Sequence, residues 1–277
     1  MDRKPARVLT VAGSDSGGGA GIQADLKTIT VLGGFGMSVI TALTAQNTLG
    51  VQGIFEVPIP FIEQQFDAVA TDIGVDAAKT GMLVNAAVVR AVAAKIRQYH
   101  IEKLVVDPVM VAKGGALLIE NDARENFISE LVPLALVLTP NIPEAEALAG
   151  LSIRSVEDMK EAAMRIREMG VPNVIVKGGH LQGPATDIFF DGRRFYEFYS
   201  ERIATKDSHG TGCTYSSAIA TGLAVGKPLL EAVREAKAYV TEVIRYAWRI
   251  GQGHGPTNHA APLLNALDRI LPFLDQR

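Results

Sequence analysis

Short apolar segments alternate with longer segments of helical periodicity along most of the chain. Short apolar runs are typical of buried strands, and they occur at residues 8–12, 77–82, 104–106, 136–138 and 174–176. Between them, apolar residues recur every three or four positions, which predicts helices over residues 22–32, 61–73, 86–100 and 156–169. Strands that alternate with helices form a mostly parallel sheet with both faces covered, so the pattern predicts an α/β fold.

The pattern changes in three places. Residues 38–46 are rich in β-branched side chains and predict a further strand. Polar and apolar residues alternate over 187–203 around Asp191-Gly192, which predicts an antiparallel hairpin at the sheet edge. Helical spacing closes the chain over residues 214–225, 229–250 and 261–271. No linker, repeat or low-complexity stretch divides the sequence, so we expect residues 1–277 to form a single domain.

Composition narrows the classes of partner. The net charge of −3 argues against nucleic acid and against an anionic membrane surface, which leaves small molecules. A single cysteine among 277 residues excludes an internal disulfide and fits a reducing compartment. The N-terminus lacks the apolar stretch of a signal peptide, and no apolar run reaches the ~18 residues of a membrane span. We therefore expect a soluble, cytoplasmic protein.

The single cysteine, Cys213, lies in the segment Ser208-His209-Gly210-Thr211-Gly212-Cys213-Thr214, which leads into an apolar helix. Glycines allow a ligand to approach the backbone, and a helix start offers unpaired N–H groups, so this turn suits an anion such as phosphate. A thiol at such a position is expected to have a lowered pKa. Two alternatives remain, namely a small buried hydrophobe and a nucleophile paired with His209 in a hydrolase.

Other polar residues follow the predicted strands, and the carboxyl ends of parallel strands share one rim. Asn141 and Glu144 stand at a helix start, where they either cap the helix or face a hydrated Mg²⁺. Asp107 either forms a salt bridge or faces the same metal. Lys177 is either a surface lysine or a phosphate contact, and Lys237 lies within a helix, where a lysine is usually solvated.

The first glycine cluster offers a rival from another class. Residues 19–24 fit the relaxed G-x-G-x-x-A form of a dinucleotide site between a strand and a helix. The loop is longer than that motif requires, and the second strand ends at Gln46 instead of an acid. An NAD-dependent oxidoreductase and a non-catalytic binding module are thus the alternatives to a phosphoryl-transfer enzyme. The histidine spacing does not suggest structural zinc, and the loop 253–259 receives no role.

Seven motifs, in order, resemble the hydroxymethylpyrimidine and phosphomethylpyrimidine kinases of thiamine biosynthesis. They begin at Ala12, Thr44, Lys79, Asp107, Thr139, Lys177 and His209: AGSDSGGGAGIQAD, TAQNT, KTGM, DPVM, TPNIPEA, KGGH and HGTGCT. The resemblance implies a ribokinase-like three-layer α/β/α fold with a central, mostly parallel sheet. It implies transfer of the ATP γ-phosphate to a hydroxymethylpyrimidine and then to its monophosphate, with Mg²⁺. Because pyridoxal kinases are relatives, vitamin B6 is a second candidate substrate.

The resemblance also implies roles for individual residues. Gln46 recognises the pyrimidine edge, and the same pocket is lined by Asp15, Met82 and Val109. Asn141 and Glu144 match a magnesium and phosphate motif with Asp107 nearby, and Lys177 and Lys237 lie on the nucleotide side. Gly210, Thr211 and Gly212 form the anion hole, where Cys213 replaces the aspartate base of many ribokinase-like enzymes. Members of the family commonly pair, so a homodimer is implied.

Overall fold

The computed structural model describes residues 4–109, 121–181 and 183–266. Within them, eight strands form one sheet in the order β10-β9-β8-β7-β6-β5-β1-β2. In this sheet, β2, β1, β5, β6, β7 and β8 run parallel. The pairs β8–β9 and β9–β10 are antiparallel, which confirms the predicted edge hairpin. The strands are β1 (Arg7–Ala12), β2 (Phe35–Ile40), β5 (Ala77–Thr80), β6 (Leu104–Val106), β7 (Val137–Leu138), β8 (Asn173–Val176), β9 (Asp187–Phe190) and β10 (Phe195–Phe198).

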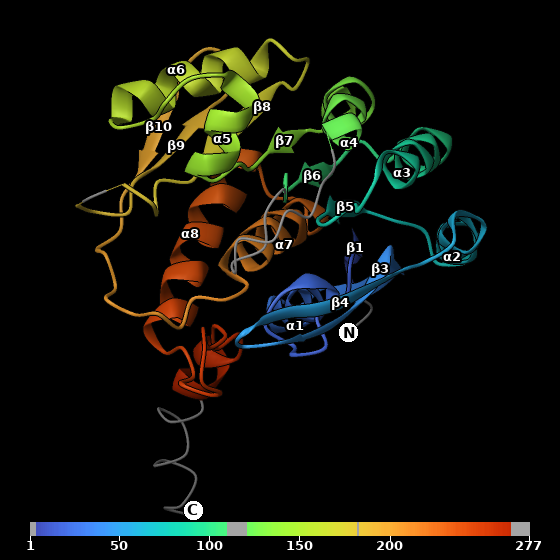
Figure 1. The fold of residues 1–277 in the computed structure, drawn as a ribbon, viewed down its shortest axis with the longest axis horizontal. Helices are drawn as coiled ribbons and strands as arrows, with labels where there is room; N and C mark the ends of the chain where they lie inside the picture. Colours follow the sequence, from blue (N-terminus) through green and yellow to red (C-terminus); the bar gives the residue numbers. More distant parts are fainter. Residues whose placement is uncertain (1–3, 110–120, 182, 267–277) are drawn as a thin grey trace, which may run out of the picture.

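Helices cover both faces of this sheet (Figure 1). One layer holds α2 (Ile59–Asp72), α3 (Ala86–Gln98), α4 (Asn121–Asn126), α5 (Ile142–Ala149) and α6 (Val156–Arg167), with a π-helical turn at Phe127–Leu131 and a 3₁₀ turn at Val132–Leu134. The other layer holds α1 (Gly21–Val31), α7 (Thr211–Ala224) and α8 (Leu229–Arg245). The structure therefore has the three-layer α/β/α architecture that the resemblance implies.

The strands hold the two layers together because both of their faces are apolar. Along β1, Leu9 and Val11 pack into the α2–α6 layer, while Val8 packs into the α1–α7–α8 layer. Along β6, Val105 faces the second layer. Fully buried parallel strands show this continuous apolar character, because no position in them faces water.

The predicted strand over residues 38–46 is wrong in its boundaries. It divides at Thr41 into β2 and β3 (Ala42–Asn47), and β3 pairs with β4 (Gly50–Glu56) in a separate two-stranded ribbon. The sequence pattern missed β4 because most of its residues are exposed and do not alternate. Toward the C-terminus, α8 ends at Arg245, and a further helix begins at residue 261; its predicted part beyond residue 266 lies outside the described residues.

In the part of the chain that the structure describes, none of the helices combines the length and the apolar character needed to cross a bilayer.

Candidate active site

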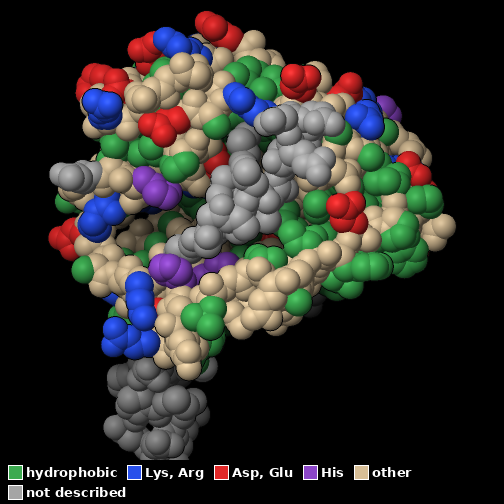
Figure 2. Space-filling view, viewed as in Figure 1, with side chains coloured by type: hydrophobic (Ala, Val, Ile, Leu, Met, Phe, Trp, Pro, Cys, Tyr) green, Lys and Arg blue, Asp and Glu red, His purple; other side chains and the backbone are tan. Residues whose placement is uncertain are grey.

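The loops after the parallel strands and the start of α7 enclose one cavity of about 820 Å³. Figure 2 shows a hollow on this face with histidine and basic side chains beside it. The cavity wall contains all of the candidate residues: Asp15, Gln46, Met82, Asp107, Val109, Asn141, Glu144, Lys177, Gly210, Thr211, Gly212, Cys213 and Lys237. The expected shared rim is therefore present, although Met110 lies outside the described residues.

The start of α7 has the glycine-rich turn geometry on which the predicted anion-binding role depends. Gly210 is the N-cap of α7 with φ 83°, a left-handed conformation that favours glycine. A Cβ at this position would lie 1.8 Å from the carbonyl oxygen of Gly19, so only glycine fits against the first loop. Gly212 lies beside Asp107 and Lys177, because a Cβ there would be 3.3 Å from a side-chain atom of each. The helix start and the charged residues thus meet at one point.

Cys213 lies in the first turn of α7 and is partly exposed. The expectation of a lowered thiol pKa is wrong. Burial raises the pKa of Cys213 to about 11, against the opposing charge of Lys79 and with further upward contributions from Asp25 and Asp107. Desolvation outweighs the helix dipole here, and the free protein therefore holds a protonated thiol at neutral pH.

His209 does not serve as the partner of that thiol. Its Nε2 lies 2.8 Å from Asp15 Oδ2 and 3.3 Å from Gln46 Nε2. The hydrolase alternative needs His209 beside Cys213, whereas the imidazole is held by Asp15 and Gln46.

The first loop is organised by Asp15. Its carboxylate accepts hydrogen bonds from the backbone N–H groups of Gly17, Gly19 and Ala20, at 2.8, 3.1 and 2.8 Å. Burial alone would raise the pKa of Asp15, but hydrogen bonds from His209 and from the backbone of Ala20 and Gly17 outweigh it and lower the pKa. Asp15 lines the cavity as expected, yet its ionised carboxylate is largely used in holding this loop in shape.

Gln46 and Met82 lie on the cavity wall near the same loop. A Cβ on Gly13 would lie 2.2 Å from Met82 Cε, so the glycine makes room for the methionine. Gln46 projects from the end of β3, which carries it from the protruding ribbon back over the cavity. This part of the cavity wall combines apolar side chains with the Gln46 amide, a combination suited to an aromatic ring with polar edge atoms.

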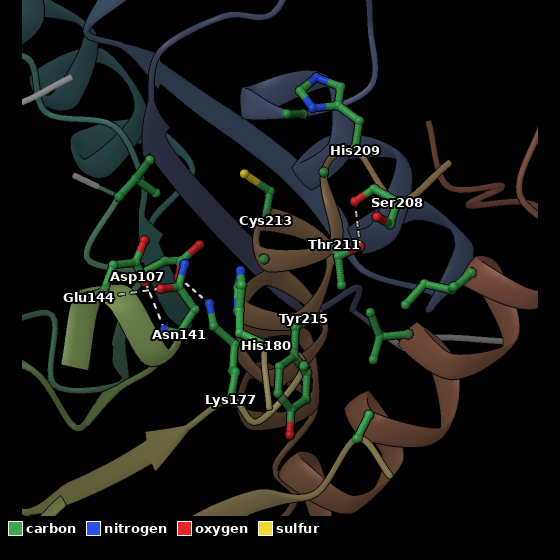
Figure 3. Close-up of a pocket in the computed structure, with 18 of the residues that line it drawn as sticks. Asp107, Asn141, Glu144, Lys177, His180, Ser208, His209, Thr211, Cys213 and Tyr215 are labelled. Atoms are coloured by element: carbon green, nitrogen blue, oxygen red, sulfur yellow. Dashed lines mark hydrogen bonds and ion pairs between the residues drawn. The ribbon is translucent and has the colours of Figure 1, made fainter. Parts of the chain in front are cut away.

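Charged side chains gather at another part of the wall (Figure 3). Lys177 Nζ lies 2.8 Å from Asp107 Oδ1, and the lysine side chain is only 13% exposed, so the surface-lysine alternative is wrong. Thr139 Oγ1 also donates to Asp107 Oδ1, at 3.1 Å. Burial, opposed by the charge of Lys177 and reinforced by Asp107, raises the pKa of Glu144 to about 7.

The capping interpretation of Asn141 and Glu144 is confirmed. The Asn141 side chain accepts from the backbone of Glu144 at 3.0 Å, and the Glu144 carboxylate accepts from the backbone of Asn141 at 2.8 Å. Among the residues that the structure describes, no cluster of three or more His, Cys, Asp and Glu side chains could hold a metal ion. A hydrated Mg²⁺ needs only one or two carboxylates, so the neighbouring Glu144 and Asp107 still fit it.

Lys237 is buried, contrary to the expectation of a solvated lysine. Its Nζ lies 2.8 Å from Asp187 Oδ2 and donates to the carbonyl of Ala185 at 2.9 Å. The helical pattern could not show this, because α8 turns that face toward the edge hairpin and not toward water. Asp187, Tyr215 and Arg202 also line this end, and the sequence reasoning named none of them.

Comparison with known proteins identifies the family to which the chain belongs. A profile of the phosphomethylpyrimidine kinase family matches residues 15–258. The chain belongs to the phosphomethylpyrimidine kinase family. It is 48% identical to a hydroxymethylpyrimidine/phosphomethylpyrimidine kinase of Bacillus subtilis, over 95% of this chain and 97% of that protein. It is 57% identical to a thiamine biosynthesis bifunctional protein of Geobacter sulfurreducens over 95% of this chain, but spans only 54% of that longer protein.

A solved structure is equally informative. The ADP complex of Bacillus subtilis pyridoxal kinase superposes with a TM-score of 0.89 at 38% identity, covering 95% of this chain and 100% of that chain. The ribokinase-like fold is thereby confirmed. Membership of a kinase family also decides against the oxidoreductase and the non-catalytic module, so the cluster at Gly19 is not a dinucleotide fingerprint.

Proposed function

We propose that this protein transfers the ATP γ-phosphate to 4-amino-5-hydroxymethyl-2-methylpyrimidine and then a second phosphate to the resulting monophosphate. One observation carries the proposal: the amide and apolar wall at Gln46 and Met82 share a cavity with the cations Lys177 and Lys237, and the Gly210–Cys213 turn belongs to the same wall. Support also comes from the kinases of the same name among the relatives and from the ADP held by a structural neighbour.

In this proposal, some residues bind the pyrimidine and others bind ATP and its phosphates. Gln46 pairs with the pyrimidine edge, because an amide offers both a donor and an acceptor, while Met82 and Val109 face the ring. The N–H groups at Gly210–Gly212 hold the phosphate in transfer, and Lys177, beside Gly212, offsets its charge. Asn141 and Lys237 contribute to the nucleotide side.

Cys213, after its own proton has been lost to solvent, is the proposed acceptor of the hydroxymethyl proton. With a pKa of about 11, only a small fraction of the thiol is ionised at neutral pH, but the thiolate so formed is a strong base. Positioning and charge then contribute most to the transfer. Glu144, with Asp107, is the proposed holder of Mg²⁺, which when bound supplies positive charge to the phosphates. Two carboxylates close enough to raise the pKa of one of them are suited to such a cation.

A second candidate substrate is pyridoxal or pyridoxine. The likeness to a pyridoxal kinase favours it, because that neighbour shares the whole architecture. An ADP-release assay with hydroxymethylpyrimidine, its phosphate, pyridoxal and pyridoxine, run side by side, tests both candidates. ADP release with the two pyrimidines supports the proposal, and release with none of the four compounds contradicts it.

Two further expectations stay proposals. We propose a homodimer, for which the exposed Leu43, Ile54 and Phe55 of the β3–β4 ribbon offer an apolar surface. Sedimentation velocity of the purified protein tests this directly. The free Cys213 fits a reducing compartment, and we propose the cytoplasm as the place of action.

A further inference from the structure

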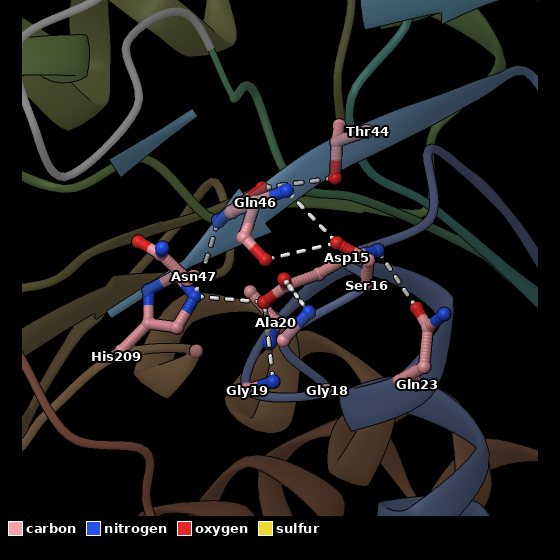
Figure 4. A network of polar contacts seen from close by, with 12 residues as sticks. Asp15, Ser16, Gly18, Gly19, Ala20, Gln23, Thr44, Gln46, Asn47 and His209 are labelled. Atoms are coloured by element: carbon pink, nitrogen blue, oxygen red, sulfur yellow. Dashed lines mark hydrogen bonds and ion pairs between the residues drawn. The ribbon is translucent and has the colours of Figure 1, made fainter. Parts of the chain in front are cut away.

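The side chains of Thr44, Gln46, His209 and Asp15 form a connected network whose donors and acceptors can be counted (Figure 4). Thr44 Oγ1 lies 2.7 Å from the carbonyl oxygen of Ser14 and 3.2 Å from Gln46 Oε1. A carbonyl can only accept, and a hydroxyl has one hydrogen, so the shorter contact takes the Thr44 hydrogen. Toward Gln46, the Thr44 hydroxyl can then only accept, so two acceptors, Thr44 Oγ1 and Gln46 Oε1, face each other.

The other side of the network is fixed by Asp15. His209 Nε2 lies 2.8 Å from Asp15 Oδ2, which is an ionised carboxylate and can only accept. Nε2 of His209 must therefore carry a hydrogen, whether the ring is neutral or protonated. The same Nε2 lies 3.3 Å from Gln46 Nε2, so in the orientation drawn in Figure 4 two donors face each other.

Both mismatches vanish if the Gln46 amide is turned by half a turn about its last bond. The NH₂ group then donates to Thr44 Oγ1. The carbonyl oxygen shares the single Nε2 hydrogen of His209 with Asp15, which lies closer and remains its main acceptor. Oxygen and nitrogen of an amide occupy nearly the same volume, so the neighbours decide which is which. We propose that His209, held by Asp15, fixes the Gln46 amide in this turned orientation and so determines which ring edge the cavity accepts.

The backbone of His209 is held firmly enough for this task. Its N–H donates to the carbonyl of Gly255 at 3.1 Å, and its carbonyl accepts from the N–H of Thr257 at 3.2 Å. The loop 253–259, which has no role on sequence grounds, thus acts as a support for His209. Because His209 directly precedes Gly210, the same support continues into the anion-binding turn.

The consequence is a fixed order of donor and acceptor for the substrate. An aminopyrimidine edge places a ring-nitrogen acceptor beside an amino donor, and an amide pairs with both only in one orientation. A ring edge with the opposite order would require the amide to turn and to lose its bonds to Thr44 and His209. His209 is therefore a positioning residue for specificity, and this inference rests on the proposed function of the cavity.

A matched pair of variants tests it. His209→Leu removes the donor, while His209→Gln keeps an N–H donor near the position of Nε2. We expect His209→Leu to weaken hydroxymethylpyrimidine binding, measured by calorimetry without ATP, by about tenfold or more, because the amide loses a hydrogen bond to a charged network. The ratio of kcat/KM for hydroxymethylpyrimidine over pyridoxal should fall similarly, with KM for ATP nearly unchanged and His209→Gln close to the parent.

Equal losses for both acceptors and for ATP, or an unchanged ratio in His209→Leu, would overturn the inference. Circular dichroism and melting temperature of each variant separate loss of fold from loss of specificity. The ¹⁵N spectrum of the unmodified protein gives a readout that needs no substrate, because a protonated Nε2 of His209 has a distinct shift. An unprotonated Nε2 overturns the inference alone, whereas an absence of ADP release by the parent protein overturns only the proposed function.

Discussion

Lys79 and Asp25 form an ion pair with no solvent contact, in which Lys79 Nζ lies 2.9 Å from Asp25 Oδ2 and both side chains are 0% exposed. The pair joins the middle of β5 to α1, and Ser217 of α7 donates to Asp25 Oδ1 at 2.6 Å. Burial alone would lower the pKa of Lys79, but the charge of Asp25 raises it. The network therefore connects α1 and α7 to the sheet.

Lys79→Met should destabilise the protein strongly, because it leaves the Asp25 carboxylate buried without its cation. Removing one partner of a buried pair costs about 3–5 kcal/mol, which urea unfolding measures directly. Adding Asp25→Asn to Lys79→Met should recover part of the loss. Lys160→Met, which breaks the more exposed pair with Glu197, is the control and should change little. An unaltered unfolding free energy in Lys79→Met would show that the pair is dispensable.

Cys213 should react with alkylating agents only slowly at neutral pH, because its pKa is raised to about 11 by burial. The rate of iodoacetamide modification should rise about tenfold per pH unit up to pH 10, and kcat/KM for the hydroxymethyl acceptor should follow it if the thiolate is the base. Cys213→Ala should abolish the alkylation and lower kcat by ~10²–10⁴-fold, while both substrates still bind. Alkylation that reaches its plateau near pH 7 would contradict the raised pKa.

Much of the fold follows from local pattern. The apolar run at Leu104–Val106 predicts a strand buried on both faces, and the structure has β6 there. The alternation around Asp191-Gly192 predicts a hairpin with one buried face, and the structure has β9 and β10 there. The rim of strand ends also follows, since parallel strands bring their carboxyl ends together. These features need no knowledge of distant contacts.

The remaining features depend on how deeply a side chain is buried and on partners that are distant in the sequence. A helix start predicts a low pKa for Cys213, but only the structure shows how much protein surrounds the sulfur. Lys237 follows a helical pattern that gives no sign of Asp187, which lies on another element. Lys79 did leave a signal, because a lysine inside a buried strand requires a buried partner, and Asp25 lies on the apolar face of the first helix.

Glu144 should make the ligand-free protein less stable as the pH rises from about 5 to 8. Its pKa is raised from 4.5 to about 7 by burial, so over this interval the folded state binds more protons than the unfolded state. The unfolding free energy therefore falls with rising pH, and Glu144→Gln should flatten that dependence. Urea unfolding at several pH values measures it. A slope that persists unchanged in Glu144→Gln would assign the effect to other groups.

Mg²⁺ should reverse that trend if Glu144 helps to hold it, because the cation binds the ionised carboxylate and displaces its proton. The rise in melting temperature on adding Mg²⁺ with ATP should be larger at pH 8 than at pH 6. In Glu144→Gln the rise should be small at both values. An equal rise in the parent protein and in Glu144→Gln would place the metal elsewhere.

Lys177 and Lys237 should differ in which kinetic constant they affect, although both are buried lysines paired with an aspartate. Lys177 Nζ lies beside Gly212 in the turn at the start of α7, so in the proposed function its charge acts on the phosphate in transfer. Lys177→Met should lower kcat by about 10–100-fold, the loss expected for a charge-assisted hydrogen bond. Lys237→Met should mainly raise KM for ATP, because Lys237 holds Asp187 and Ala185 in the cavity wall. Steady-state kinetics with varied ATP separates the two, and the opposite pattern would exchange their proposed positions along the nucleotide.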